Sequence, residues 1–385
     1  MRPLLLLSVL LSLAACSGCR TSPARDVAAP DCTLVEDGFG PNGTVPITVE
    51  VVAEGLEIPW GIAWLPGGDA LVSERPGRVR LLRAGVLQPT PVATVKIAAS
   101  GESGLLGIAV PPDFASHRKF YLYVTTDEGG ERQNRVERWT LSEDSTTATF
   151  ERVIFGDIPA AVYHDGGRIR FGPDGMLYIG TGDAREPDLS QDVKTPAGKL
   201  LRLTPEGEVP ADNPFPGNPA FLLGIRNTQG FDWKDGDTLY FTDHGPSGEM
   251  FRRGHDEVSV VRKGDNLGWP TLYGCEAAEG LVTPSFTWKD AVPPGGAALY
   301  TGDAIPEWKG SLLIGSLGAR HLHRVAFSPD NPRQVTQHEV YLRNQWGRLR
   351  EVIMGPDGHL YVTTSNCDGR GDCGTRKDVI LRIRR

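Results

Sequence analysis

Six copies of a short turn followed by an apolar strand recur along this chain, and this repetition restricts the folds open to it. The two clearest copies share a Pro-Asp-Gly turn, and the spacing of about 45 to 75 residues per copy is that of four-stranded blades with variable loops. We therefore predict an all-β fold, a six-bladed β-propeller. A large β-sandwich is the alternative, but it does not need a recurring Pro-Asp-Gly turn. The copies are Leu65-Pro-Gly-Gly-Asp-Ala-Leu-Val-Ser73, Phe120-Tyr-Leu-Tyr-Val-Thr125, Gly172-Pro-Asp-Gly-Met-Leu-Tyr-Ile179, Trp233-Lys-Asp-Gly-Asp-Thr-Leu-Tyr-Phe241, Trp308-Lys-Gly-Ser-Leu-Leu-Ile-Gly315 and Gly355-Pro-Asp-Gly-His-Leu-Tyr-Val362.

Composition agrees with a turn-rich globular protein. The chain has 385 residues, of which 39% are hydrophobic, 47 are glycine and 30 are proline. No segment keeps a long apolar period of 3.6 residues, so helices should be few. The net charge is −8 and no basic stripe is present, which argues against a nucleic-acid partner.

The N-terminus has the pattern of an export signal. Met1 and Arg2 precede an apolar run over residues 4–13 that is too short to span a bilayer. The following Leu13-Ala14-Ala15-Cys16 resembles the lipobox of bacterial lipoproteins, in which the cysteine becomes the lipidated N-terminus; an ordinary signal peptide with an incidental Cys16 is the alternative. We expect a signal peptide over residues 1–15, a tether over 16–45 and the propeller over 46–385. The protein would then be exported to the bacterial cell envelope and anchored by lipid at the outer membrane, with no other membrane contact.

Export makes disulfides plausible. Cys367 and Cys373 lie six residues apart with no histidine nearby, so a locally closed loop is favoured over a metal or redox pair. Cys32 and Cys275 are candidates for a second pair, which sequence alone cannot establish.

One histidine lies where chemistry is plausible. His164, in Tyr163-His164-Asp165-Gly166-Gly167-Arg168, runs directly into the third turn–strand copy, beside glycines that let the backbone turn tightly. An imidazole of near-neutral pKa can act as a general base. A lone histidine is more often a packed or solvated bystander, so other motifs must decide.

Several motifs together resemble the soluble pyrroloquinoline quinone-dependent sugar dehydrogenases, also called the glucose/sorbosone dehydrogenase family. The resemblance extends from Val51 to Arg384, with the motifs in the same order. They are Pro59-Trp-Gly-Ile-Ala-Trp64, Gly101-Glu-Ser-Gly-Leu-Leu-Gly-Ile108, His164-Asp-Gly-Gly-Arg168, Gly224-Ile-Arg-Asn-Thr-Gln-Gly230, His244-Gly-Pro-Ser-Gly248, Asp256-Glu257, Gly264-Asp-Asn-Leu-Gly-Trp-Pro270 and Arg348-Leu-Arg-Glu-Val352.

The resemblance implies roles for individual residues. His164 matches the family's catalytic base, which accepts the proton of the sugar C1 hydroxyl as hydride leaves C1. The cofactor, a quinone with three carboxylates, needs positively charged partners. Arginine is well suited because its planar guanidinium binds a carboxylate through two hydrogen bonds. Glu102 would contact sugar or cofactor, although a solvated loop carboxylate is an equal alternative. The expected cofactor-binding residues are Glu102, Arg226, Asn227, Arg348 and Arg350.

The resemblance also implies calcium. The backbone carbonyls of Gly245 and Pro246 match those that hold the calcium ion gripping the quinone, and Asp256 and Glu257 match a second, structural calcium site. The chain inserts roughly residues 249–255 between these motifs, relative to shorter relatives.

Two positions depart from the family's pattern. Tyr163 stands where many relatives carry a small polar residue or aspartate before the histidine. Gly318 occupies a place where relatives often carry a lysine, and Arg320 is the candidate to supply the missing cation at the cofactor.

The implied function is oxidation of aldose sugars at C1 to lactones. Hydride would pass to pyrroloquinoline quinone, and electrons would then pass to an acceptor such as a membrane quinone or a small carrier. Two other classes are open. A calcium-dependent propeller hydrolase of the lactonase type would need metal ligands that converge on the central channel. A non-catalytic sugar- or protein-binding propeller could lose cofactor contacts.

Overall fold

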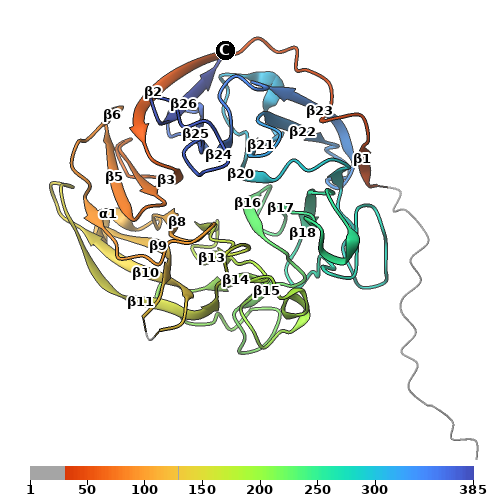
Figure 1. The fold of residues 1–385 in the computed structure, drawn as a ribbon, viewed down its shortest axis with the longest axis horizontal. Coiled ribbons are helices and arrows are strands. Elements are labelled where there is room, and N and C mark those ends of the chain that lie inside the picture. The colour runs from red at the N-terminus through yellow and green to blue at the C-terminus, as the bar shows by residue number, and fades with distance from the viewer. Residues whose placement is uncertain (1–30, 129) are drawn as a thin grey trace, which may run out of the picture.

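The protein is an almost entirely β structure built as a ring of six sheets. The computed structural model describes residues 31–128 and 130–385. Their strands form six sheets that surround a common centre like the blades of a propeller (Figure 1). The predicted six-bladed β-propeller is therefore confirmed.

The first three blades follow one another along the chain. Blade one contains β3 (Pro59–Trp64), β4 (Ala70–Glu74), β5 (Arg78–Arg83), β6 (Val86–Leu87) and the short β7 (Ala93–Thr94). Blade two contains β8 (Leu105–Ala109), β9 (Lys119–Thr126), β10 (Gln133–Leu141) and β11 (Ala148–Pro159). Blade three contains β12 (Ile169–Phe171), β13 (Leu177–Gly180), β14 (Leu200–Leu203) and β15 (Ala220–Leu222).

Two of the remaining blades recruit a strand from the N-terminal region. Blade four contains β16 (Thr228–Trp233), β17 (Leu239–Asp243), β18 (Glu257–Val261), β19 (Phe286–Trp288) and β1 (Thr33–Val35). Blade five contains β20 (Pro294–Leu299), β21 (Leu312–Ser316), β22 (Leu322–Phe327) and β23 (Val335–Tyr341). Blade six contains β24 (Leu349–Met354), β25 (Leu360–Thr364), β26 (Asp378–Arg384) and β2 (Thr48–Leu56).

Helices are few in the described residues, as the sequence predicts. They are α1 (Phe114–His117) and the 3-10 helices η1 (Pro187–Gln191), η2 (Glu249–Phe251) and η3 (Pro306–Trp308). Over the described part of the chain, no helix has the length and apolar character needed to cross a bilayer.

The repeated turn marks the passage from the first to the second strand of a blade. In the third copy, the Asp174 side chain accepts hydrogen bonds from the backbone N–H of Met176 and from the Tyr178 hydroxyl. In the sixth copy, Asp357 accepts the same two kinds of bond, the hydroxyl coming from Tyr361. Each turn then places a glycine at positive φ, where other residues are strained. The same local chemistry therefore builds equivalent corners in blades three and six.

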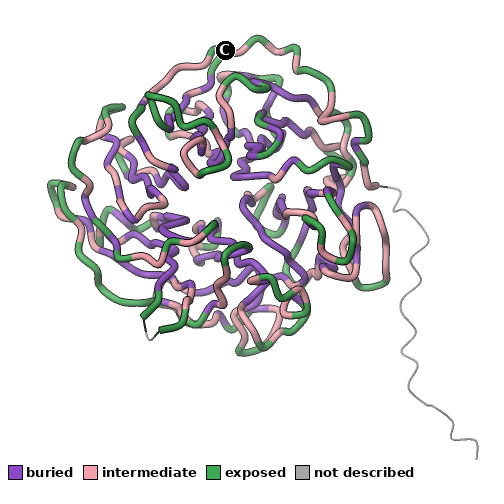
Figure 2. The backbone as a smooth tube through the Cα atoms, in the orientation of Figure 1, coloured by how far each residue is buried: buried purple, intermediate pink, exposed green. Residues whose placement is uncertain are grey.

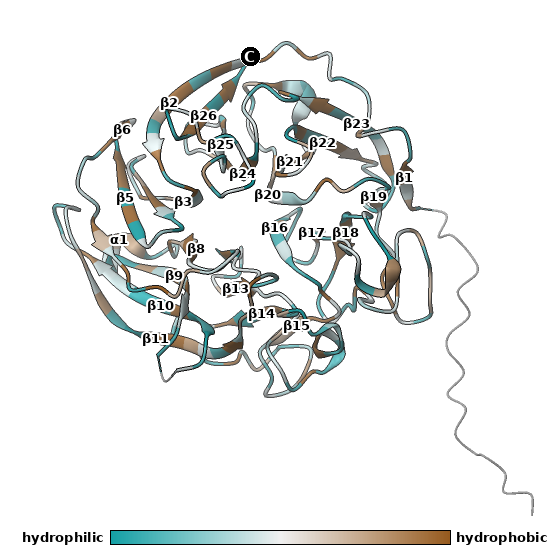
Figure 3. Ribbon diagram, viewed as in Figure 1, coloured by the Kyte–Doolittle hydropathy of each residue, from teal (hydrophilic) through white to brown (hydrophobic). Residues whose placement is uncertain are grey.

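The hydrophobic core lies between the blades. Six clusters of buried apolar side chains each join mainly two neighbouring blades, so that the set runs once around the ring. Buried residues dominate the strands near the centre, whereas exposed residues gather on the outer loops (Figure 2). Along the strands, hydrophobic residues are interspersed with hydrophilic ones (Figure 3). Packing between blades thus holds each sheet in place and fixes the ends of its innermost strand.

The two ends of the propeller meet in blade six. β2 pairs antiparallel with β26, with Thr48 opposite Arg384 and Leu56 opposite Asp378. The last blade therefore takes three strands from the C-terminus and one from the N-terminal part. This pairing closes the ring and leaves β2 as the outer edge strand of blade six.

The predicted tether extends too far along the chain. Residues 31–45 belong to the folded body: β1 pairs in parallel with β19, and the Gly43 N–H donates to the Val340 carbonyl over 2.8 Å. A disulfide joins Cys32 to Cys275, the pair that sequence left open. The predicted boundary at residue 46 is wrong because strand pairing and a disulfide hold this segment against blades four and five. The expected signal peptide and Cys16 lie outside the described residues.

Candidate active site

A cavity of about 420 Å³ lies where the innermost strands of the blades begin. The residues that line it come from different blades. Most lie at, or just before, the start of β3, β8, β12, β16, β20 and β24, and the others follow the second strands β13, β17, β21 and β25. The ring arrangement therefore brings together side chains that are far apart in sequence. Among them are Trp60, Glu102, His164, Asn227, Pro293 and Arg350.

His164 enters the cavity just ahead of β12. Its Nδ1 lies 2.7 Å from the Asp183 Oδ1, and its side chain is 10% exposed. Asp183 also accepts the Trp269 indole N–H and the Arg185 backbone N–H. A carboxylate that already faces two donors acts as an acceptor, so His164 carries its proton on Nδ1. Its Nε2 is left with a free lone pair, as a general base requires.

The backbone at His164 is unusually constrained. Its φ is 68°, in the left-handed region that few non-glycine residues adopt. Its carbonyl lies so close to Gly182 that a Cβ at that position would meet the oxygen at 1.9 Å. Only glycine can therefore stand at position 182 without displacing the histidine.

Glu102 connects the neighbouring polar groups. Its Oε2 accepts the His164 backbone N–H over 3.1 Å and the Asn227 side-chain amide over 3.4 Å. Its Oε1 accepts from Arg370 over 3.0 Å. Burial acts to raise the pKa of Glu102, but the nearby positive groups and hydrogen-bond donors outweigh it and hold the pKa below the ordinary value. Glu102 is thus an ionised carboxylate that accepts hydrogen bonds from three groups around the cavity. The alternative, a carboxylate solvated on a loop, is not supported.

The backbone of Arg226 and Asn227 is held in place by a buried carboxylate. Asp243, at the end of β17, accepts the backbone N–H groups of both residues over 2.7 Å. The Arg226 residue is only 2% exposed, and its Nε has no hydrogen-bond partner among the described residues. A buried cationic donor without a partner indicates a place for an acceptor.

Arg348 and Arg350, at the start of the innermost strand of blade six, form a second cationic group in the cavity. They lie two residues apart, so both side chains project from the same face of the strand. Arg350 donates to Ser365 and Gln229, and burial lowers its pKa to about 9, with Arg75 and Arg348 adding repulsion. The cavity therefore favours a negatively charged ligand.

Residues 249–255 place a further carboxylate in the cavity. Glu249 pairs with Arg226 over 2.8 Å, and its Oε1 lies 3.9 Å from the His164 Nε2. Burial would raise the pKa of Glu249, yet Arg226 and backbone donors lower it to about 2. Next to Glu249, Met250 and Phe251 are exposed at 47% and 104%. Residues 249–255 thus join exposed apolar side chains at the surface to an acid beside the histidine.

The predicted calcium residues lie next to the cavity. Asp256 accepts the Gly245 backbone N–H over 2.9 Å and the Val292 N–H over 2.6 Å, and the Pro246 carbonyl accepts from Gly254 over 3.1 Å. Glu257 lies directly opposite Asp243 in the antiparallel pairing of β18 with β17. Burial raises the pKa of Asp256 to about 6 and that of Glu257 well above its ordinary value. No group of three or more His, Cys, Asp or Glu residues in the described ranges is arranged to hold a metal ion.

Arg320 does not line the cavity. It is exposed and borders a separate hollow together with Asn344, Trp346 and Arg376. The backbone at Arg320 has φ of 56°, in the tight turn between β21 and β22 that carries it away from the centre. Its assignment as a cofactor cation is not supported by this position.

Comparison with known proteins identifies the family. The sequence profile described as glucose/sorbosone dehydrogenase matches residues 56–381. The chain belongs to this family.

Other members of the glucose/sorbosone dehydrogenase family match nearly the whole chain. The aldose sugar dehydrogenase YliI of Escherichia coli is 34% identical over 349 residues, which are 84% of this chain and 91% of the relative. Quinoprotein glucose dehydrogenase B of Acinetobacter calcoaceticus is 25% identical over 433 residues, covering 88% and 89%. The PQQ-bound structure of the aldose sugar dehydrogenase of Streptomyces coelicolor superimposes with a TM-score of 0.79 at 36% identity, covering 89% and 99%. The predicted resemblance is confirmed.

Four side chains of this site were not foreseen from the sequence. Asp183 follows β13, and a polar residue just beyond a buried strand is a signal that could have found it. Glu249 lies in the segment of residues 249–255, which the sequence marks only as an expected insertion. The other two, Asp368 and Arg370, lie inside the segment bounded by Cys367 and Cys373 and contact Arg348 and Glu102, respectively. Nothing in their spacing indicates that the segment turns toward the centre.

Proposed function

We propose that this protein is a pyrroloquinoline quinone-dependent dehydrogenase that oxidises aldose sugars at C1 to lactones, with His164 as general base. The observation that carries the proposal is the pairing of His164 with Asp183 in a cavity lined by arginines. A base with a free lone pair supports abstraction of a hydroxyl proton, and the arginines support an anionic cofactor.

The cavity fits the charge of the cofactor. Five arginines line it, and three of them, Arg226, Arg348 and Arg350, are buried. Arg226 has an unpartnered Nε, and Arg350 is held among like charges. With Asn227 and Arg348, these residues would hold the three carboxylates and the ring oxygens of the quinone. When bound, the quinone supplies the acceptor for the hydride.

The protein supplies the proton acceptor and its orientation. Asp183 fixes the imidazole so that the His164 Nε2 faces the cavity and can take the proton of the C1 hydroxyl. As the imidazole becomes positive, the same carboxylate stabilises it. Glu102 fixes the backbone of His164, so the base keeps its position during the transfer.

Calcium is part of the proposal. The Gly245 and Pro246 carbonyls are hard oxygen ligands suited to a calcium ion near the quinone. Asp256 and Glu257 are proposed for a second ion, because the Asp243 charge acts on Glu257 and no arginine or lysine among the described residues forms an ion pair with these three acids. A bound cation would relieve the repulsion among these buried carboxylates.

Reconstitution with pyrroloquinoline quinone and calcium is expected to give sugar-dependent dye reduction. The purified protein is incubated with both, and reduction of an artificial acceptor is followed with a panel of aldoses. Omission of calcium, or addition of a chelator, is expected to leave the rate near background, because the ion orients the cofactor and acts as a Lewis acid.

Two results would count against the proposal. Saturating quinone without turnover on any sugar would favour a binding propeller. Full activity after chelation would remove calcium from the proposal while leaving the dehydrogenase intact.

Export and lipid attachment at Cys16 complete the proposal. The reduced cofactor would pass electrons to a membrane quinone or small carrier, and a lipid anchor at the outer membrane would keep the enzyme in the envelope. Incorporation of a labelled fatty acid that is lost in Cys16→Ser is the expected result. Labelling that persists in this variant would rule out Cys16 as the attachment site.

A further inference from the structure

The loop between β25 and β26 is closed on itself and anchored at its base. A disulfide joins Cys367 to Cys373, six residues apart. The buried Asp378 accepts the backbone N–H groups of Asn366 and Cys367, and also that of Ile58 in blade one. A short closed loop with a fixed base has few conformations to lose when it orders. The loop of residues 365–377, which we call the arm, is therefore held rigidly against the propeller.

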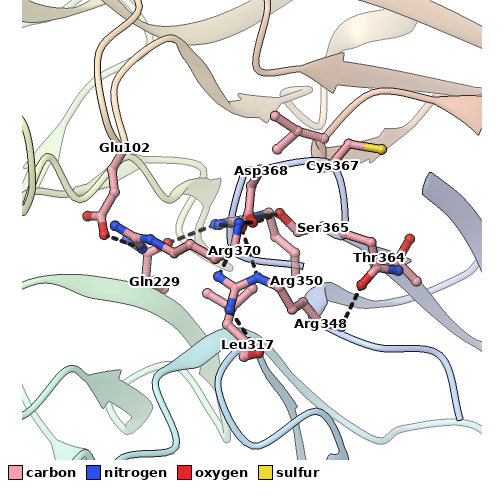
Figure 4. Close-up of polar contacts among 12 residues, drawn as sticks. Glu102, Gln229, Leu317, Arg348, Arg350, Thr364, Ser365, Cys367, Asp368 and Arg370 are labelled. Carbon is pink, nitrogen blue, oxygen red and sulfur yellow. Dashed lines mark hydrogen bonds and ion pairs between the residues drawn. The ribbon is translucent and has the colours of Figure 1, made fainter. Parts of the chain in front are cut away.

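Asp368 joins the arm to the buried arginines. Its Oδ2 accepts from the Arg348 Nε over 2.9 Å and lies 4.0 Å from an Arg350 nitrogen (Figure 4). Its Oδ1 accepts the backbone N–H of Arg370 over 2.9 Å. The side chain is 2% exposed. One carboxylate thus fixes both the arginine pair and the backbone from which Arg370 projects.

Arg370 extends from the arm to the other side of the cavity. Its guanidinium donates to the Glu102 Oε1 over 3.0 Å (Figure 4). It also lies 5.4 Å from the centre of the Tyr163 ring. Its side chain is 49% exposed, compared with 8% for Arg348. The guanidinium makes no other side-chain hydrogen bond to described residues. It therefore retains unused N–H donors at the rim of a cavity that favours anions.

We propose that Arg370 is a further cofactor-binding residue and that the Cys367–Cys373 disulfide holds it over the cavity. The inference rests on the proposed function and adds a rim contact to it. Arg226, Arg348 and Arg350 would hold the bound quinone from the depth of the cavity, and Arg370 would contact one of its carboxylates at the mouth. Glu102 holds the guanidinium in place before the cofactor arrives.

The test compares two arginines of the same loop. Arg376 is also exposed, but it lies over Trp346 and borders the separate hollow. Quinone binding is titrated by tryptophan fluorescence in the wild type, Arg370→Gln and Arg376→Gln. R370Q is expected to raise Kd about tenfold or more, because a charge-assisted contact is lost. R376Q is expected to change Kd by less than about twofold, because a distant exposed charge is screened.

The disulfide is tested by a double-mutant cycle. Mass spectrometry without reductant first checks that Cys367 and Cys373 are bonded in the exported protein. The variant with both cysteines replaced by serine is expected to raise Kd. Adding R370Q to it is expected to change Kd less than R370Q does in the wild type, because the disulfide acts through Arg370.

Each alternative outcome decides a different claim. Absence of quinone binding by the wild type would overturn the proposed function and this inference together. Binding by the wild type with equal effects of R370Q and R376Q, or with no effect of either, would overturn only the rim contact. Additive effects in the cycle, or two free thiols at Cys367 and Cys373, would remove the disulfide from the inference.

Discussion

Replacing His164 with alanine is expected to lower kcat by about 10² to 10⁴ while leaving the Kd for the quinone nearly unchanged. With Nδ1 directed at Asp183, the His164 imidazole has a free lone pair on Nε2 that can take the hydroxyl proton, and its removal leaves the arginines of the cavity in place. The rate is measured by dye reduction and the Kd by fluorescence titration.

Two further variants serve as controls for the loss of activity in His164→Ala. His164 has φ of 68°, a conformation that asparagine tolerates better than alanine, so His164→Asn separates loss of the base from backbone strain. His117→Ala is the matched control, because His117 is exposed on α1 and pairs only with Asp113. A near-wild-type rate in both His164 variants would show that the histidine is structural.

The blades could be predicted because their signal is local. A Pro-Asp-Gly turn is stabilised by its own aspartate, as at Asp174, whatever the rest of the chain does. Closure of the ring could not be predicted in the same way. It depends on β2 pairing with β26, and on the Ile58 N–H donating to Asp378, a contact across 320 residues of sequence. No local pattern encodes a partner at such a distance.

The site residues likewise fall into those that local motifs predict and those whose position depends on the course of a loop. His164, Arg226 and Arg350 lie in motifs at the starts of innermost strands, and a propeller must bring such positions to its centre. Arg320 lies outside the cavity because its position depends on the direction of one tight turn, which the motif around it does not specify. Arg370 was missed for the converse reason: the anchored loop turns toward the centre instead of away from it.

Asp183 offers the sharpest test of how the base is oriented. It accepts from His164 and from the Arg185 backbone on Oδ1, and from the Trp269 indole on Oδ2. An asparagine in its place has one acceptor and one donor group. If its oxygen faces His164, its amino group opposes the indole N–H. If its amino group faces His164, the imidazole must accept on Nδ1 and carry its proton on Nε2, which blocks the base.

Either orientation of the asparagine removes the charge opposite the imidazolium that forms during proton transfer. A charge-assisted hydrogen bond contributes about 1.5 to 3 kcal/mol, so Asp183→Asn is expected to lower kcat by about 10 to 100-fold from this cause alone, with a small change in KM. Reversal of the tautomer would lower it further, and the ¹⁵N shifts of the His164 ring report which nitrogen carries the proton. Trp269→Phe is the matched variant, because it removes one donor to Asp183 and keeps the carboxylate; its kcat should fall much less. An unchanged kcat in Asp183→Asn, with the proton still on Nδ1, would show that the carboxylate neither orients nor stabilises the base.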